Sequence, residues 1–72
     1  MKNNELEVNY SAELDIISID NISKEYERSI RTGDFTIDLD PEGEVRGVEI
    51  QNLSRILGVE REELTKVSDV DL

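Results

Sequence analysis

The stretch DLDPEGEVRGVE, residues 38–49, carries acidic residues spaced almost as they are in a calcium-binding loop. Such a loop takes oxygen ligands from its first, third, fifth and twelfth positions, and has a glycine at the sixth, where the chain turns around the ion. Five of these positions hold a suitable residue: Asp38, Asp40, Glu42, Gly43 and Glu49. The spacing therefore indicates calcium binding as one candidate function.

The residues around this stretch argue against such a loop. A calcium-binding loop of this kind is held between two helices, whereas the flanking DFTIDLD and VEIQN alternate with the period of two typical of strands. Pro41 stiffens the middle of the stretch, and Arg46 puts a cation in the ninth position. Folded as a hairpin, Asp38 and Glu49 lie back along two strands. We expect no dedicated metal site, and a weak calcium site through the 38–49 hairpin remains an alternative.

The composition offers little for catalysis. The 72 residues include no Cys and no His, so the most reactive thiol, the commonest general base and the usual zinc ligands are missing. Paired carboxylates act as acid and base only in a cleft that desolvates one of them, and a chain of this length closes one small core at most. We expect no enzyme activity and no cofactor.

The charge balance is strongly acidic, with 18 Asp and Glu against 8 Lys and Arg and a formal net charge of -10. Direct binding to nucleic acid requires clustered cations, and the eight in this chain are dispersed. The acidity favours either solubility or adaptation to salt, or attraction to a basic protein. No apolar run has the length of a membrane span or a signal-peptide core, so we expect a cytoplasmic protein without membrane association.

The apolar pattern predicts a β-sheet. Residues 5–10 alternate with period two, and residues 14–19 are dense in β-branched side chains. A three-residue connection between them would place Tyr10 opposite Leu14 and join apolar to apolar residues in a hairpin.

The segment 21–33 is compatible with two structures. Its apolar residues recur every four positions, as on a helix, yet they also share strand parity: Ile22, Tyr26 and Ile30. A two-residue turn at Thr32 and Gly33 would place Ile30 opposite Phe35, with further pairs in line. We therefore favour a strand over a helix.

Local signals complete the predicted fold. Asp40 to Gly43 has the residues of a tight turn, Gly47 indicates a β-bulge, and Gly58 indicates a helix end. The predicted class is α+β, a small antiparallel β-sheet of about five strands (a meander) followed by one or two short C-terminal helices. Within a single domain over 1–72, the predicted elements are strands at about 5–10, 14–19, 25–31, 34–39 and 44–51, helices at about 53–57 and 60–67, and a tail at 68–72.

Two stretches of the chain resemble the domain-of-unknown-function 2283 family of small bacterial and archaeal domains. They are YSAELDIISI and DLDPEGEVRGVEIQN, and their matching positions are Tyr10, Glu13, Asp15, Ile17, Ile19, Asp40, Gly43, Val45 and Gly47 to Ile50. The resemblance covers about residues 8–52, although Ser11 replaces an acidic residue and 21–33 does not align. It implies an antiparallel sheet with a small helical element and no assigned reaction. Some members look like neighbours of small ribonuclease toxins, which implies an antitoxin role for that subset.

We interpret the chain as a non-catalytic, acidic protein-interaction module, with neutralisation of a small basic toxin as its concrete form. The alternative is a homo-oligomeric structural protein, for example a homodimer. The candidate partner-binding residues are Asp15, Asp34, Asp38, Asp40, Glu42 and Glu49 for an acidic face, and Leu57, Leu64 and Val67 for an apolar contact.

Overall fold

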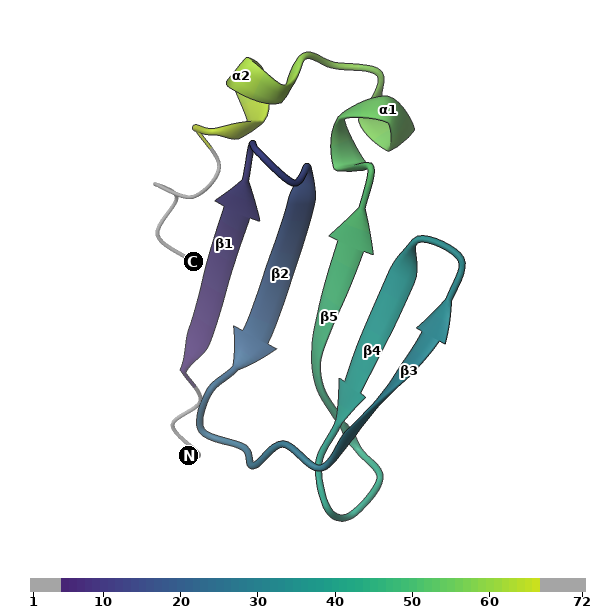
Figure 1. The fold of residues 1–72 in the computed structure, drawn as a ribbon. Coiled ribbons are helices and arrows are strands. Elements are labelled where there is room, and N and C mark those ends of the chain that lie inside the picture. The colour runs from purple at the N-terminus through teal and green to yellow at the C-terminus, as the bar shows by residue number, and fades with distance from the viewer. Residues whose placement is uncertain (1–4, 67–72) are drawn as a thin grey trace.

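The computed structural model describes residues 5–66, which form one antiparallel sheet and two short helices (Figure 1). The predicted α+β class is confirmed. The elements are β1 (Leu6–Ser11), β2 (Ile16–Asn21), β3 (Arg28–Thr32), β4 (Phe35–Leu39), β5 (Val45–Gln51), α1 (Leu53–Leu57) and α2 (Arg61–Leu64).

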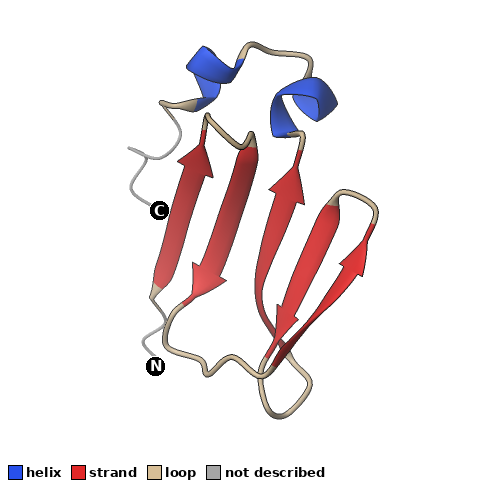
Figure 2. Ribbon diagram, in the orientation of Figure 1, coloured by secondary structure: helices blue, strands red, loops and turns tan. Residues whose placement is uncertain are grey.

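The strands lie in the order β1-β2-β5-β4-β3, so the last strand in the sequence is the central strand of the sheet. The hairpins β1–β2 and β3–β4 flank β5 on either side. Both helices lie beyond one end of the sheet, and the chain from β2 to β3 crosses at the opposite end (Figure 2). The helices therefore approach only part of the sheet.

The β1–β2 hairpin differs from the prediction in its register. Tyr10 lies opposite Ile17, not Leu14, because residues 12–15 form a turn of four residues instead of three. Asp15 ends this turn with a positive φ of 56°, a conformation that Asp tolerates better than most residues. Leu14 is left 63 % exposed in the turn.

Residues 28–32 form a strand, which confirms the preference for a strand over a helix in this segment. The turn that follows lies one residue later than predicted, at Gly33 and Asp34, so Ile30 pairs with Ile37 instead of Phe35. Gly33 takes a φ of 59°, which suits the first position of a two-residue hairpin turn and explains the shift.

The predicted bulge in β5 is confirmed. The register of β4 against β5 shifts beside Gly47, and Arg46 is the extra residue. A Cβ atom at Gly47 would lie 2.8 Å from the carbonyl oxygen of Ile19 and would collide with the Asp20 carboxylate. Glycine is required here because β2 passes so closely.

The two helices are short. The structure places α1 over the predicted residues, whereas α2 covers only the first part of the predicted 60–67. Val67 and the predicted tail 68–72 lie outside the described residues.

The register assigns the strand side chains to two faces, because residues directly opposite each other on neighbouring strands share a face. The apolar face consists of Leu6, Val8, Tyr10, Ile17, Ile19, Ile30, Phe35, Ile37, Leu39, Val45, Val48 and Ile50. The other face is predominantly polar and is called the polar face below.

Candidate interaction surfaces

The helices cover only one corner of the apolar face. Leu53 and Leu64 pack with Tyr10 and Ile17, and all four are at most 9 % exposed. We call these four residues the covered corner. They form the core cluster of the described residues.

Outside the covered corner Leu39 is also buried, at 6 % exposed, but several other large side chains of the apolar face remain accessible. Tyr10, Ile17, Ile50 and Phe35 lie opposite one another in a single row across four strands, yet exposure rises from 8 % at Tyr10 to 46 % at Phe35. Other large side chains of this face are similarly accessible. The bare region consists of Leu6 (57 % exposed), Ile30 (45 %), Phe35 (46 %) and Val45 (55 %).

A buried carboxylate holds the covered corner together. Asp15 accepts hydrogen bonds from the Tyr10 hydroxyl (2.5 Å), the Ser54 backbone N–H (3.0 Å) and the Ser54 hydroxyl (2.7 Å). The Nε of Arg61 lies 3.7 Å from Asp15 Oδ2, the oxygen that also accepts from the Ser54 hydroxyl. Because Asn52 provides no side-chain cap for α1, the β1–β2 turn supplies this cap through Asp15.

These contacts also set the protonation of Asp15. Burial alone would raise the pKa of this carboxyl, but the hydrogen bonds from Tyr10 and Ser54, with the charge of Arg61, outweigh burial and lower it. The pKa of the Tyr10 hydroxyl is raised, first by burial and then by its hydrogen bond to Asp15. Asp15 is thus a charged residue that ties α1 and α2 to the sheet.

A second buried carboxylate organises the opposite end of the molecule. Asp40 accepts backbone N–H bonds from Glu42 (3.0 Å) and Glu44 (2.9 Å), and these bonds, the one from Glu44 most of all, lower its pKa despite burial. Gly43 closes the predicted turn by donating to the Asp40 carbonyl at 2.9 Å, with a φ of 83°. The turn prediction is confirmed, and the Asp40 carboxylate stabilises the turn.

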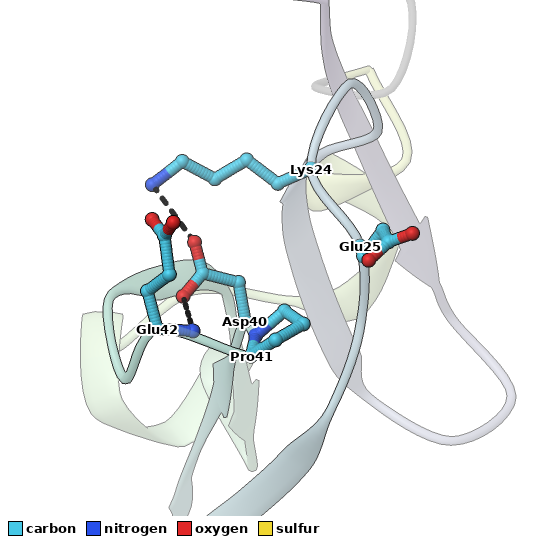
Figure 3. A pocket seen from close by; sticks show the side chains of 5 residues that line it. All are labelled: Lys24, Glu25, Asp40, Pro41 and Glu42. Atoms are coloured by element: carbon cyan, nitrogen blue, oxygen red, sulfur yellow. Dashed lines mark hydrogen bonds and ion pairs between the residues drawn. The ribbon is translucent and has the colours of Figure 1, made fainter.

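The same hairpin contains the acidic group nearest to a metal site. Carboxylate oxygens of Asp40, Glu42 and Glu44 lie within 4.8 Å of one another. Figure 3 shows Lys24 reaching toward Asp40. Its Nζ lies 3.7 Å from Asp40 Oδ2 and 3.5 Å from Glu44 Oε1. A pocket of about 210 Å³ lies beside it, lined by Lys24, Glu25, Asp40, Pro41 and Glu42. The Lys24 ammonium group already lies beside these carboxylates, so an added cation would have to compete with it for them.

The fold therefore separates the residues that have the spacing of a calcium-binding loop. Asp40 and Glu42 belong to the turn, whereas Asp38 lies on β4 and Glu49 on β5. The ligands that the spacing suggested do not gather around one point, as the hairpin interpretation predicts.

The polar face has a row of acidic side chains. Glu7, Asp20, Gly47 and Asp38 lie opposite one another on four neighbouring strands, and Asp20 occupies the space that Gly47 leaves open. Burial is the largest influence on Asp20 and raises its pKa. The Arg46 guanidinium, 3.4 Å away, opposes this rise, and the negative charges of Asp38 and Glu7 add to it. We call Glu7, Asp20 and Asp38 the acidic row.

Several predicted partner-binding residues are not on an exposed face. Asp15, Asp38 and Asp40 are only 3 %, 8 % and 7 % exposed, so the expectation that they form an accessible acidic face is wrong. Their oxygens accept hydrogen bonds from nearby turn, helix and hydroxyl groups, which keeps them inside. Leu64, expected in an apolar contact, is 6 % exposed because it packs on the covered corner.

The remaining predicted residues are scattered. Asp34 is half-buried and accepts a 3.0 Å bond from the Asn52 amide, and Glu49 is half-buried on the polar face. Glu42 and Leu57 are exposed on opposite ends of the molecule. Val67 lies outside the described residues.

Sequence reasoning missed Glu7 and Asp20 in the acidic row. Strand parity contained the signal for both, because alternating positions must face opposite sides of a sheet. Two helices of five and four residues are also too few to cover five strands.

Two further findings bear on function. Within residues 5–66, each helix is too short and too polar to cross a membrane. None of the protein-family models, curated proteins or solved structures compared with this chain matches it, so the resemblance to the domain-of-unknown-function 2283 family stays a prediction.

Proposed function

We propose that the protein is a non-catalytic interaction module that docks another protein chain on its apolar face. The bare region supports this proposal most directly. Its four large apolar side chains are each about half exposed on one face of one sheet. Soluble monomers rarely leave apolar patches of more than a few hundred Å² in contact with water.

The chemistry around the apolar face also suits protein docking. The polar residues that share this face lie at its margins: Asn21, Arg28 and Thr32. An apolar centre with a polar rim is the usual composition of a protein interface. The strands already fix the backbone beneath these side chains, so binding orders little further chain.

The buried carboxylates favour binding over catalysis. Among residues 5–66, every buried side-chain nitrogen or oxygen atom has a hydrogen-bond partner. Asp15 and Asp40 both have lowered pKa values and are held by hydrogen bonds within the fold. A general acid or base works best with a pKa near the working pH, and the pKa values of these two carboxyls are shifted away from neutrality.

A second candidate function rests on the acidic row. Together with a net charge of -10, the accessible carboxylates of the polar face, Glu7, Asp20 and Glu49, favour a basic protein partner there. Complementary charge would speed association and could block a cationic substrate-binding surface, as antitoxin-like neutralisation requires.

The docking proposal can be tested with a matched pair of variants. Phe35→Lys places a charge on the apolar face, whereas Thr36→Lys places the same charge on the polar face one residue away. Native mass spectrometry of gently lysed producing cells should find the wild-type chain bound to a protein, itself or another. Phe35→Lys should abolish this complex and Thr36→Lys should keep it. A wild-type chain that occurs alone would refute the proposal.

The second candidate has its own test. Glu7→Gln and Glu49→Gln remove two charges from the polar face without touching the apolar face. Titration with a small basic protein at low ionic strength should show weaker binding for the double variant. Equal affinity would exclude a role for this face.

A further inference from the structure

We infer that the chain docked on the apolar face is a second copy of this protein, with the two sheets stacked face to face about a two-fold axis. This inference rests on the proposed function and names its partner. Two sheets stacked in this way form a sandwich with a shared apolar layer, and their facing side chains interdigitate. A two-fold arrangement lets one patch meet the same patch of the other copy.

The distribution of charge favours a second copy. The strand residues of the apolar face include one charged side chain, Arg28, on the edge strand β3. The acidic row lies on the opposite face. Two chains of charge -10 repel each other through most of their surfaces, and face-to-face stacking points the acidic rows away from each other. The apolar face is thus the surface through which like-charged copies approach at least cost.

The available area is sufficient. Five strands about 4.8 Å apart, each of five to seven residues rising about 3.3 Å, cover on the order of 500 Å². Two such faces amount to about 1,000 Å² together; the covered corner takes part of this footprint and protruding side chains add to it, so the interface lies near the lower limit for a specific one. A stacked dimer therefore needs no further element.

The small size of the chain also favours a second copy as the partner. A chain of 72 residues without cysteine has no disulfide to compensate for a small core. The core cluster of the described residues contains only the four members of the covered corner. A second copy would extend this cluster across all five strands, since Ile19, Ile37 and Val48 in the middle of the face are only half-buried.

The first test is the molar mass of the purified chain in solution, by light scattering or sedimentation. We expect twice the 8.2 kDa of one chain at micromolar concentration. Phe35→Lys should give a folded monomer and Thr36→Lys a dimer. Because lysine lowers the net negative charge, dissociation by Phe35→Lys cannot come from added repulsion. A wild-type monomer, or a dimer that survives Phe35→Lys, overturns the inference.

The second test applies even if Phe35→Lys fails to fold. Val48 lies in the middle row of the central strand, so a two-fold axis through the face brings it near its counterpart. Because the chain has no cysteine, Val48→Cys gives one thiol per copy. A short bismaleimide should join two Val48→Cys chains and leave Glu49→Cys chains, on the opposite face, unjoined. The reverse result overturns the inference.

These outcomes separate the inference from the proposed function. A wild-type monomer that carries a different protein, lost on Phe35→Lys, contradicts the second copy and leaves the docking function standing. A monomer that carries no protein contradicts both.

Discussion

Tyr10 and Phe35 lie in the same row of the apolar face, yet Tyr10 is 8 % exposed and Phe35 is 46 % exposed. Both are aromatic, and both lie at the end of the sheet nearest the helices. The difference in exposure comes from the contacts of Asp15, which act as a tether for the helices. Asp15 ties Ser54 and Arg61 to the β1–β2 turn and thereby brings the helices onto Tyr10.

The comparison shows that apolarity alone does not decide what a short chain covers. A helix of four or five residues has little stability by itself and stays where specific contacts hold it. The hydrogen bonds of Asp15 provide such contacts at the covered corner. In the described part of the chain, no equivalent tether draws an element over the bare region.

The largest effect should come from the covered corner. Leu64→Ala removes a buried side chain and should lower the free energy of unfolding by about 2–5 kcal/mol. Leu57→Ala, at a position 56 % exposed on the neighbouring helix, should cost less than about 1 kcal/mol. Chemical denaturation measures both. Equal losses would show that the two regions do not differ in packing.

The bare region should affect stability through association. If a second copy covers it, each tenfold rise in protein concentration adds about 1.4 kcal/mol to the apparent free energy of unfolding. Thermal melting of the wild-type chain should therefore shift upward with concentration, while Phe35→Lys should melt at a constant temperature. A wild-type melting temperature that does not change with protein concentration would show that the stabilising contacts lie entirely within one chain.

Acid should loosen the covered corner before the sheet. The folded-state pKa of Asp15 lies below its ordinary value of 3.8. Its stabilisation is therefore present above that value and lost as pH falls through the lower, folded-state pKa. Hydrogen-exchange protection of α1 should fall in this range while the middle of β2 and of β5, away from the turns that Asp15 and Asp40 stabilise, keeps its own, and Asp15→Asn should already lack that protection at neutral pH. Simultaneous loss in all elements would contradict the tether.

Salt should give the smallest effect, with opposite signs on the two faces. Copies of charge -10 repel each other, so salt should strengthen their association slightly. Binding of a basic partner to the acidic row should weaken under the same conditions. Sedimentation and titration across an ionic-strength series distinguish the two. Self-association that weakens with salt would indicate contact through charged surfaces.

Features with a local signal could be predicted from the sequence. The turn at Asp40 to Gly43, the bulge beside Gly47 and the bounds of α1 each follow from a glycine or proline and its immediate neighbours. Strand parity likewise identified the side chains that share a face in β4, whereas the register predicted for β2 placed Leu14 opposite Tyr10 where the structure has Ile17. Such signals act over a few residues, so one sequence suffices to read them.

The remaining features depend on contacts between distant residues. The β1–β2 register follows from Asp15, whose main partner, Ser54, is 39 positions away. No local pattern marks Asp15 as a helix cap, and its acidity suggested a surface role instead. The placement of β5 beside β2 had one available signal, since a glycine inside a strand often marks close approach of another backbone.

The central position of β5 also determines how the chain can fold. A ribosome releases β1–β2 and β3–β4 before the strand that joins them, so the nascent chain holds two hairpins that share no strand pair. An isolated hairpin is marginally stable at best in water. The complete sheet therefore cannot form until residue 51 is free, because β5 supplies the pairings that join the two hairpins. A chain cut before Val45 would keep four of the strands and lose the sheet.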